Sequence, residues 1–167
     1  MKYLLLTVCL LFCLSAKAQN MSLSPAEVAE NSLKSLEGLK GVERDWDSFR
    51  SYFTPDVRIS LLRKSTDGEE EVRHLTLEEF IEKAGANYLK NGFYEYPVTD
   101  PVVHTYGQTA VVWQPYAIKF NMEGEEIMRG INIYHLIQVN GQWRITFLTW
   151  EAQNETMPVT EWRESQE

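Results

Sequence analysis

Three histidines are the first candidates for acid–base chemistry in this sequence, because imidazole as a group needs little perturbation to titrate near neutral pH. His104 and His135 both fall within predicted strands, where either could serve as a general base. Tyr116 or Asn132 would then be the electrophilic helper. The alternative is a half-buried strand residue hydrogen-bonded to a neighbour, and the lack of a dyad spacing favours it. His74 precedes a predicted helix start and is expected to be exposed.

Charged and aromatic residues of the predicted strands form a second group of candidates, for ligand binding. Arg129, Glu95 and Glu151 could form a charge cluster that orients a polar or anionic ligand. The alternative, an ion pair between strands, is the more common role for opposite charges on neighbouring strands. Trp113 and Trp150 could line a pocket or belong to the core. The expected ligand-binding residues are Arg129, Asn132, Tyr116, Trp113, Trp150, Glu95 and Glu151.

The sequence offers no recognisable site for a metal or a cofactor. The histidines lack the i, i+4 spacing of metal ligands on a helix and have no cysteine partners. The only cysteines, Cys9 and Cys13, lie in an apolar N-terminal run. We therefore predict no metal and no cofactor, and removal of that run would also exclude a cysteine nucleophile and a disulfide framework.

A secretory signal peptide is predicted over residues 1–18. Lys2 is followed by an apolar run over residues 3–14 and by small residues at Ala16 and Ala18, the two positions that a signal peptidase reads. A run this short does not span about 30 Å of hydrocarbon. We therefore expect cleavage after Ala18, a periplasmic or secreted location, and no membrane association after cleavage.

The composition describes an acidic domain with enough apolar surface to form a core. The chain has 167 residues, 44% hydrophobic and 12% aromatic, which is typical of a single compact domain. Its 16 Lys and Arg against 24 Asp and Glu give a formal net charge of −8, and loss of Lys2 and Lys17 with the signal peptide leaves 14 against 24, or −10. Nucleic-acid binding requires a basic face and is not expected. Small molecules or other proteins remain as partners.

Two capping boxes predict helix starts. Ser24-Pro25-Ala26-Glu27 combines a capping hydroxyl, a proline at the first helical position and a glutamate three residues after the cap, and Thr76-Leu77-Glu78-Glu79 repeats the box. Between them, Trp46, Phe49 and Phe53 are spaced by three and four residues, which predicts a further short helix. Helices are thus expected at the N-terminus and after the first pair of strands.

Six extended runs are rich in β-branched and aromatic residues, at 57–64, 69–75, 93–106, 108–121, 127–139 and 142–152. Asp67-Gly68 and Asn140-Gly141 favour tight hairpin turns. Prolines inside the runs require edges or bulges, so the sheet is expected to be strongly curved. In 127–139, Asn132 and Tyr134 share one face and His135 lies on the other, and the sequence does not say which face is concave.

The order of these elements predicts an α+β domain over residues 19–153, with N-terminal helices packed on a strongly curved, mainly antiparallel sheet. Such packing leaves a cone whose open end is a place where small molecules bind. Residues 154–167 are polar and are expected to form a loosely held tail.

Several short motifs in this order resemble the nuclear transport factor 2-like superfamily, also called SnoaL-like, over residues 26–158. They are Asp45-Trp46-Asp47-Ser48-Phe49, Phe53-Thr54-Pro55-Asp56-Val57 and Asn140-Gly141-Gln142-Trp143-Arg144-Ile145. A closer similarity, to exported bacterial members of unassigned activity, lies in Gly92-Phe93-Tyr94-Glu95, Arg129-Gly130-Ile131-Asn132, Trp150-Glu151 and Met157-Pro158. The resemblance implies a cone-shaped cystatin-like roll, frequent homodimers through the convex sheet face, and a pocket that serves many tasks.

The resemblance leaves the function open between classes. Members similar to ketosteroid isomerase use a carboxylate base with a tyrosine and a protonated aspartate, and this chain offers no clear match. We therefore expect an exported protein that binds a small, largely apolar ligand in its cone, without an assigned activity. The alternative is an isomerase, dehydratase or cyclase that uses acid–base residues in the same pocket. A third possibility is an interaction module that dimerises or docks partners through the convex face.

Overall fold

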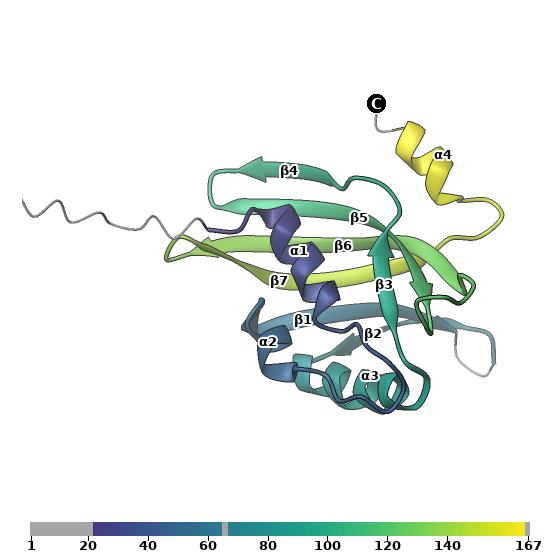
Figure 1. The fold of residues 1–167 in the computed structure, drawn as a ribbon. Helices are drawn as coiled ribbons and strands as arrows, with labels where there is room; N and C mark the ends of the chain where they lie inside the picture. Colours follow the sequence, from purple (N-terminus) through teal and green to yellow (C-terminus); the bar gives the residue numbers. More distant parts are fainter. Residues whose placement is uncertain (1–21, 65–66, 166–167) are drawn as a thin grey trace, which may run out of the picture.

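The computed structural model describes residues 22–64 and 67–165, and within them the chain forms one seven-stranded sheet. The strands are β1 Phe53–Lys64, β2 Glu70–Leu75, β3 Tyr94–Pro97, β4 Val102–Tyr106, β5 Thr109–Lys119, β6 Met128–Val139 and β7 Gln142–Ala152. Their order is β2-β1-β7-β6-β5-β3, and β4 also pairs with β5 (Figure 1). Neighbouring strands are antiparallel except β1 and β7, which run parallel.

Register shifts bend the sheet. Between β6 and β7 the register shifts after His135, where Thr146 is the extra residue, and between β1 and β7 it shifts between Phe53 and Arg58. A bulge of this kind bends its strand and increases the local twist. The β6–β7 turn has φ values of 51° at Asn140 and 78° at Gly141, which confirms the predicted tight hairpin.

Three helices cover one face of the sheet, α1 Pro25–Lys34, α2 Trp46–Arg50 and α3 Leu77–Asn91. Both predicted capping boxes are confirmed, since Ser24 pairs with Glu27 and Thr76 pairs with Glu79 in both directions. In Figure 1, α1 crosses the sheet in front of β5 to β7, while α3 packs beside β1 and β2. Within the described ranges, the helices are too short or too polar to cross a membrane.

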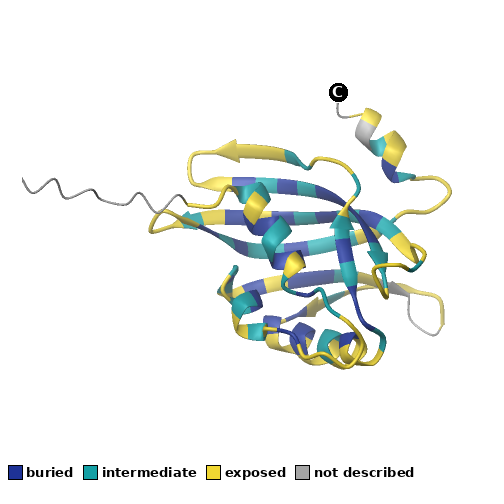
Figure 2. Ribbon diagram, viewed as in Figure 1, coloured by how far each residue is buried: buried dark blue, intermediate teal, exposed yellow. Residues whose placement is uncertain are grey.

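Aromatic side chains fill the space between the helices and the sheet. Phe49 is 1% exposed, and its ring centroid lies 4.7 Å from that of Phe53 and 5.7 Å from that of Phe80. Tyr134 and Ile145 meet this cluster from the sheet and are fully buried. Figure 2 shows the buried residues along the central strands and on the helix sides that face them. We call this side of the sheet the inner face and the opposite side the outer face.

Two predicted elements differ from the structure in their extent. The run 93–106 is two strands, β3 and β4, separated by Val98–Pro101. Pro97 ends β3 and Pro101 is the last residue of the break, and a residue without an N–H cannot continue a ladder of hydrogen bonds. Phe53, which the spacing places in a helix with Trp46 and Phe49, instead begins β1. Its ring still packs on Phe49, so the two apolar residues that are four positions apart meet although one lies in α2 and the other in β1.

The C-terminal residues are not the loosely held tail that their polarity suggests. Residues 159–164 form α4, Val159–Glu164. Val159 is 3% exposed, and Trp162 stacks on Trp113 of β5 with ring centroids 5.8 Å apart. Two apolar side chains therefore anchor a segment that is otherwise polar.

Arg44 holds the loop between α1 and α2 through its backbone carbonyls. The side chain is buried, and its guanidinium donates to the carbonyls of Leu36 and Gly38, each at 2.7 Å, and to that of Val42. A lysine has a single nitrogen and cannot reach these separated acceptors. We expect Arg44→Lys to lower the free energy of unfolding by about 2–4 kcal/mol, measured by urea denaturation.

Arg50→Lys is the matched control for that prediction. The Arg50 side chain is 38% exposed and pairs on the surface with Asp47 and Glu78, so its replacement is expected to cost less than about 1 kcal/mol. Equal losses in the two variants would contradict the role given to Arg44.

Candidate functional site

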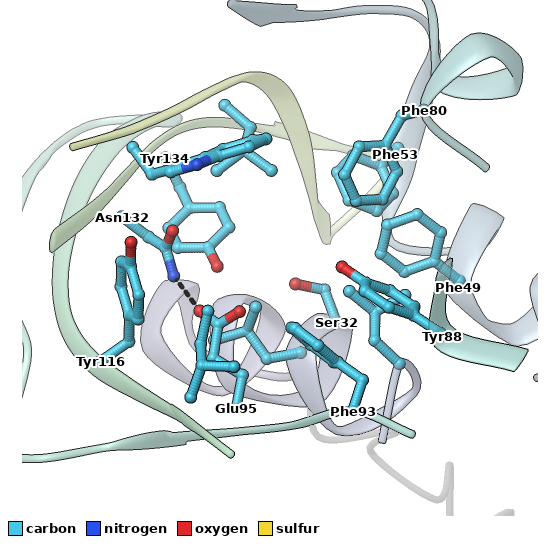
Figure 3. Close-up of a pocket in the computed structure, with 15 residues that line it drawn as sticks. Ser32, Phe49, Phe53, Phe80, Tyr88, Phe93, Glu95, Tyr116, Asn132 and Tyr134 are labelled. Atoms are coloured by element: carbon cyan, nitrogen blue, oxygen red, sulfur yellow. Dashed lines mark hydrogen bonds between the residues drawn. The ribbon is translucent and has the colours of Figure 1, made fainter. Parts of the chain in front are cut away.

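A pocket lies between the N-terminal helices and the inner face of the sheet (Figure 3). Its volume is about 100 Å³, and most of its wall is aromatic or aliphatic, including the rings of Phe49, Phe80 and Trp150. We call it the inner pocket. Its polar side chains are Ser32, Tyr88, Glu95, Tyr116, Asn132 and Tyr134.

Strand alternation brings these polar groups to one wall. On β6, Asn132 and Tyr134 are buried while the residues between and beside them are more exposed, so both side chains point to the inner face. The structure thus shows which face of β6 lies toward the helices, which the sequence does not specify. Tyr116 of β5 and Glu95 of β3 reach the same wall because β3, β5 and β6 are consecutive in the sheet.

Glu95 is a buried carboxyl group inside this apolar pocket. It is 8% exposed, and the Nδ2 of Asn132 donates to its Oε1 at 2.5 Å. Burial raises the pKa of Glu95 from its ordinary 4.5 to about 7, the charge of Glu37 acts in the same direction, and the hydrogen bond from Asn132 opposes both. Glu95 can therefore take up or release a proton near neutral pH, as a general acid or base must.

The hydroxyl of Tyr134 is a donor without an acceptor. Within residues 22–64 and 67–165 it is the buried side-chain polar atom that makes no hydrogen bond. Ser32 lies close enough to favour the ionised tyrosine and donates its own hydroxyl to the carbonyl of Ala29 at 2.7 Å, but the hydroxyls of Ser32 and Tyr134 form no hydrogen bond with each other. Figure 3 shows the Tyr134 hydroxyl directed into the pocket, on the side of Glu95 and Ser32. Burial raises the pKa of Tyr134 well above its ordinary value, so the group stays a neutral O–H.

Two further tyrosines complete the polar set. Burial raises the pKa of Tyr88 and of Tyr116, and the nearby charge of Glu95 adds to the effect in both. The Tyr116 hydroxyl donates to the sulfur of Met128 at 3.8 Å. Gly130 lies directly opposite Tyr116, and a Cβ at that position would come within 2.6 Å of the tyrosine oxygen. The missing side chain at position 130 thus leaves room for the Tyr116 ring.

Four of the residues predicted from the sequence meet at the inner pocket, namely Glu95, Asn132, Tyr116 and Trp150. Arg129 lies on the outer face, where its Nε is 2.6 Å from Glu126, so the structure does not bring it to Glu95 or Glu151. The proposed charge cluster is therefore not formed. Glu151 and Trp113 also lie on the outer face, beside the C-terminal segment.

The predicted catalytic histidines lie outside the inner pocket. His104 and His135 are exposed on the outer face, one on each side of Val111 in the register of β4, β5 and β6. They line a shallow depression there, and the ring of His135 meets that of Phe147 edge-on. His74 is exposed, as expected, and its Nδ1 lies 2.8 Å from the hydroxyl of Ser60.

Sequence reasoning did not select two side chains that now stand at the centre of the pocket. Tyr134 shares a strand face with Asn132, so the alternation that led to Asn132 also pointed to it. Ser32 is a polar residue among the buried positions of α1, beside Leu33, which is a weaker signal. Among the described residues, no three His, Cys, Asp or Glu side chains converge as metal ligands would.

Comparison with known proteins places this geometry in a known fold. A family model described as SnoaL-like domain matches residues 43–149. A protein of unknown function with a cystatin-like fold from Nostoc punctiforme PCC 73102 superposes with a TM-score of 0.58 at 12% identity, over 81% of this chain and 97% of that one. A nuclear transport factor 2-like superfamily protein from Salmonella enterica serovar Typhimurium LT2 gives a TM-score of 0.57 at 18% identity, over 81% and 92%.

These likenesses confirm the predicted fold, an α+β roll of the cystatin-like, nuclear transport factor 2-like kind. At such low identity they carry no information about activity. No curated protein sequence matches the chain.

Proposed function

We propose that this chain, which belongs to the SnoaL-like domain family, binds a small, largely apolar molecule with one hydrogen-bond acceptor in its inner pocket. The unpaired hydroxyl of Tyr134 is the observation that carries the proposal. A buried donor without a partner costs free energy, and a ligand carbonyl at this point would satisfy it. The aromatic wall would enclose the rest of the molecule.

The size of the pocket limits the ligand. A dry apolar cavity of about 150 Å³ takes up benzene. A cavity of about 100 Å³ therefore suits a small ring or a short branched chain rather than a polycyclic compound. Tyr88, Tyr116 and Tyr134 are all neutral donors, so a neutral carbonyl suits the polar wall better than a carboxylate, which would face Glu95.

Cyclopentanone and methylenecyclopentane test the proposal, because they share a shape and only the ketone has an acceptor. We expect the ketone to bind about tenfold more tightly, the value of one hydrogen bond, when binding is followed by the NMR signals of the Asn132 side-chain amide. In Tyr134→Phe the two molecules should bind equally.

Tyr134→Phe also serves as a check on folding. Removal of an unpaired buried hydroxyl is expected to leave the free energy of unfolding unchanged or raise it by about 1 kcal/mol. An equal affinity of the wild-type protein for the two molecules would overturn the proposal, since it would mean that the Tyr134 hydroxyl does not bind the ligand carbonyl.

A second candidate function is acid–base catalysis in the same pocket, of the isomerase, dehydratase or cyclase type. It is supported by Glu95, a buried carboxyl group with a pKa of about 7 that contacts Asn132, because such catalysis needs an acid or base beside a polar partner inside the pocket. Tyr134 would stabilise negative charge on a substrate oxygen while Glu95 moves a proton. The corresponding experiment is an isotope exchange, with Glu95→Gln as its variant.

Export and self-association belong to the proposal as well. The signal peptide predicted at residues 1–18 lies outside the described residues, and its charge, apolar run and small residues support a periplasmic or secreted location. A homodimer through the outer face of the sheet is supported by apolar side chains left on that face, Ile137 at 38% exposure and the half-buried Phe147 among them.

A further inference from the structure

A second pocket lies on the outer face, under the C-terminal segment. It measures about 390 Å³, nearly four times the volume of the inner pocket, and falls in the range of about 300–1,000 Å³ that is typical of ligand sites. Trp113, Ile131 and Ile133 line it from the sheet, and Met157 and Trp162 line it from the C-terminal segment. We call it the outer pocket.

The C-terminal segment is fixed over this pocket. Trp162 stacks on Trp113, with the ring planes 28° apart, and Val159 is buried. The backbone N–H of Val159 donates to the side-chain oxygen of Gln153 at 3.3 Å, which ties the start of α4 to the end of β7. A protein partner would have to displace this segment to reach the part of the sheet around Trp113, Ile131 and Ile133, whereas a small molecule fits beneath it.

The charged side chains that the structure describes in the lining of the outer pocket have one sign. Glu151 extends from the sheet and Glu161 from α4, so each wall carries a carboxylate. The lining side chains that the structure describes include no lysine or arginine, and the described ion pairs leave both glutamates uncompensated. Indole faces attract cations more strongly than other aromatic rings do, and Trp113 and Trp162 provide two.

We infer that the outer pocket is a second binding site, for a small organic cation with an apolar body, such as a quaternary or protonated amine. The apolar body lies against Ile131, Ile133 and Met157. The positive charge lies near the indole rings, with Glu151 and Glu161 on either side. This site is independent of the function proposed for the inner pocket, because the two lie on opposite faces of the sheet.

Choline and 3,3-dimethylbutan-1-ol test the inference, because they have the same shape and differ by one positive charge. We expect choline to bind the full chain with a dissociation constant in roughly the millimolar range and about tenfold more tightly than the alcohol. Binding should shift the indole N–H signals of Trp113 and Trp162 in NMR spectra and leave that of Trp150, in the inner pocket, unchanged.

Exposed glutamates supply matched variants for this experiment. In the double variant Glu151→Gln, Glu161→Gln, the preference for choline should fall at least about threefold. Glu155→Gln removes one negative charge from the C-terminal segment outside the pocket lining and should leave the preference unchanged. Equal binding of the alcohol, or an equal effect of Glu155→Gln, would overturn the inference. Tyr134→Phe should not alter choline binding, because Tyr134 lies in the inner pocket. The proposals for the inner and the outer pocket can therefore fail independently of each other.

Discussion

Glu95→Gln is expected to slow the loss of deuterium from cyclopentanone labelled at the carbons beside its carbonyl by about a hundredfold or more, the usual contribution of a positioned general base. In the proposed reaction, the Glu95 carboxylate takes the deuteron while the electrons of the C–D bond move to the carbonyl oxygen. Tyr134 donates a hydrogen bond to the enolate oxygen, and a proton that has exchanged with water returns to carbon. The rate is measured by proton NMR in water.

Glu95→Gln is close to isosteric, so a slower exchange would not result from a change in the shape of the pocket. Glutamine still offers an oxygen to the amide of Asn132, so the pocket should retain its shape while the base is lost. Glu123→Gln, a change of the same kind on an exposed loop, should leave the rate unaltered. If wild-type protein and Glu95→Gln exchange deuterium equally fast, acid–base catalysis by Glu95 is wrong. The binding of the ketone is tested separately, by the comparison of cyclopentanone with methylenecyclopentane.

The free energy of unfolding is expected to fall by about 3 kcal/mol between about pH 4.5 and pH 8 through Glu95 alone. The pKa of this carboxyl is about 7 in the folded protein and near 4.5 when it is exposed, so the folded state binds the proton more tightly. Its stabilising contribution is therefore complete below about pH 4.5 and is lost as the pH rises through 7.

The titratable groups near Glu95 either stay neutral in this pH window or act equally on wild-type protein and Glu95→Gln. Tyr88, Tyr116 and Tyr134 face it from α3, β5 and β6, and burial keeps all three neutral because it raises each pKa above its ordinary value. Burial raises the pKa of Glu37 as it raises that of Glu95, so Glu37 also loses stabilising free energy as the pH rises, but it does so in wild-type protein and in Glu95→Gln alike. Carboxylates with lowered pKa values, among them Glu79 and Glu126, change their contributions only below about pH 4.5.

Urea denaturation of wild-type protein and Glu95→Gln across this range measures the effect. The wild-type protein should lose about 3 kcal/mol more than the variant as the pH rises, so that the two curves separate most at about pH 8. Parallel curves would mean that the carboxyl of Glu95 is not held protonated by burial.

Features that depend on neighbouring residues could be predicted from the sequence. The capping boxes at Ser24 and Thr76 and the turn at Asn140-Gly141 are encoded within four residues each, and all are present. The resemblance to the family adds the order of the elements and hence the roll. The parallel pairing of β1 with β7 joins residues about ninety positions apart, and no local pattern encodes it.

The site was predictable only in part, for a specific reason. Alternation along a strand divides side chains into two sets, but which set faces the helices depends on the direction in which the whole sheet curves. Glu95 and Arg129 therefore looked like partners, although they lie on opposite faces. For the same reason His135 could be proposed as a catalytic residue while Tyr134, its neighbour in the chain, is the one that reaches the pocket.

The glycine at position 130 has an evolutionary consequence. It contributes to the lining of the outer pocket, and on the other side of the strand it makes room for the Tyr116 ring of the inner pocket. A Cβ there would meet both the Tyr116 hydroxyl and the carbonyl oxygen of Glu151. If both pockets bind ligands as proposed, a mutation at this codon would affect the two at once, so along this stretch of β6 the two sites would not diversify independently.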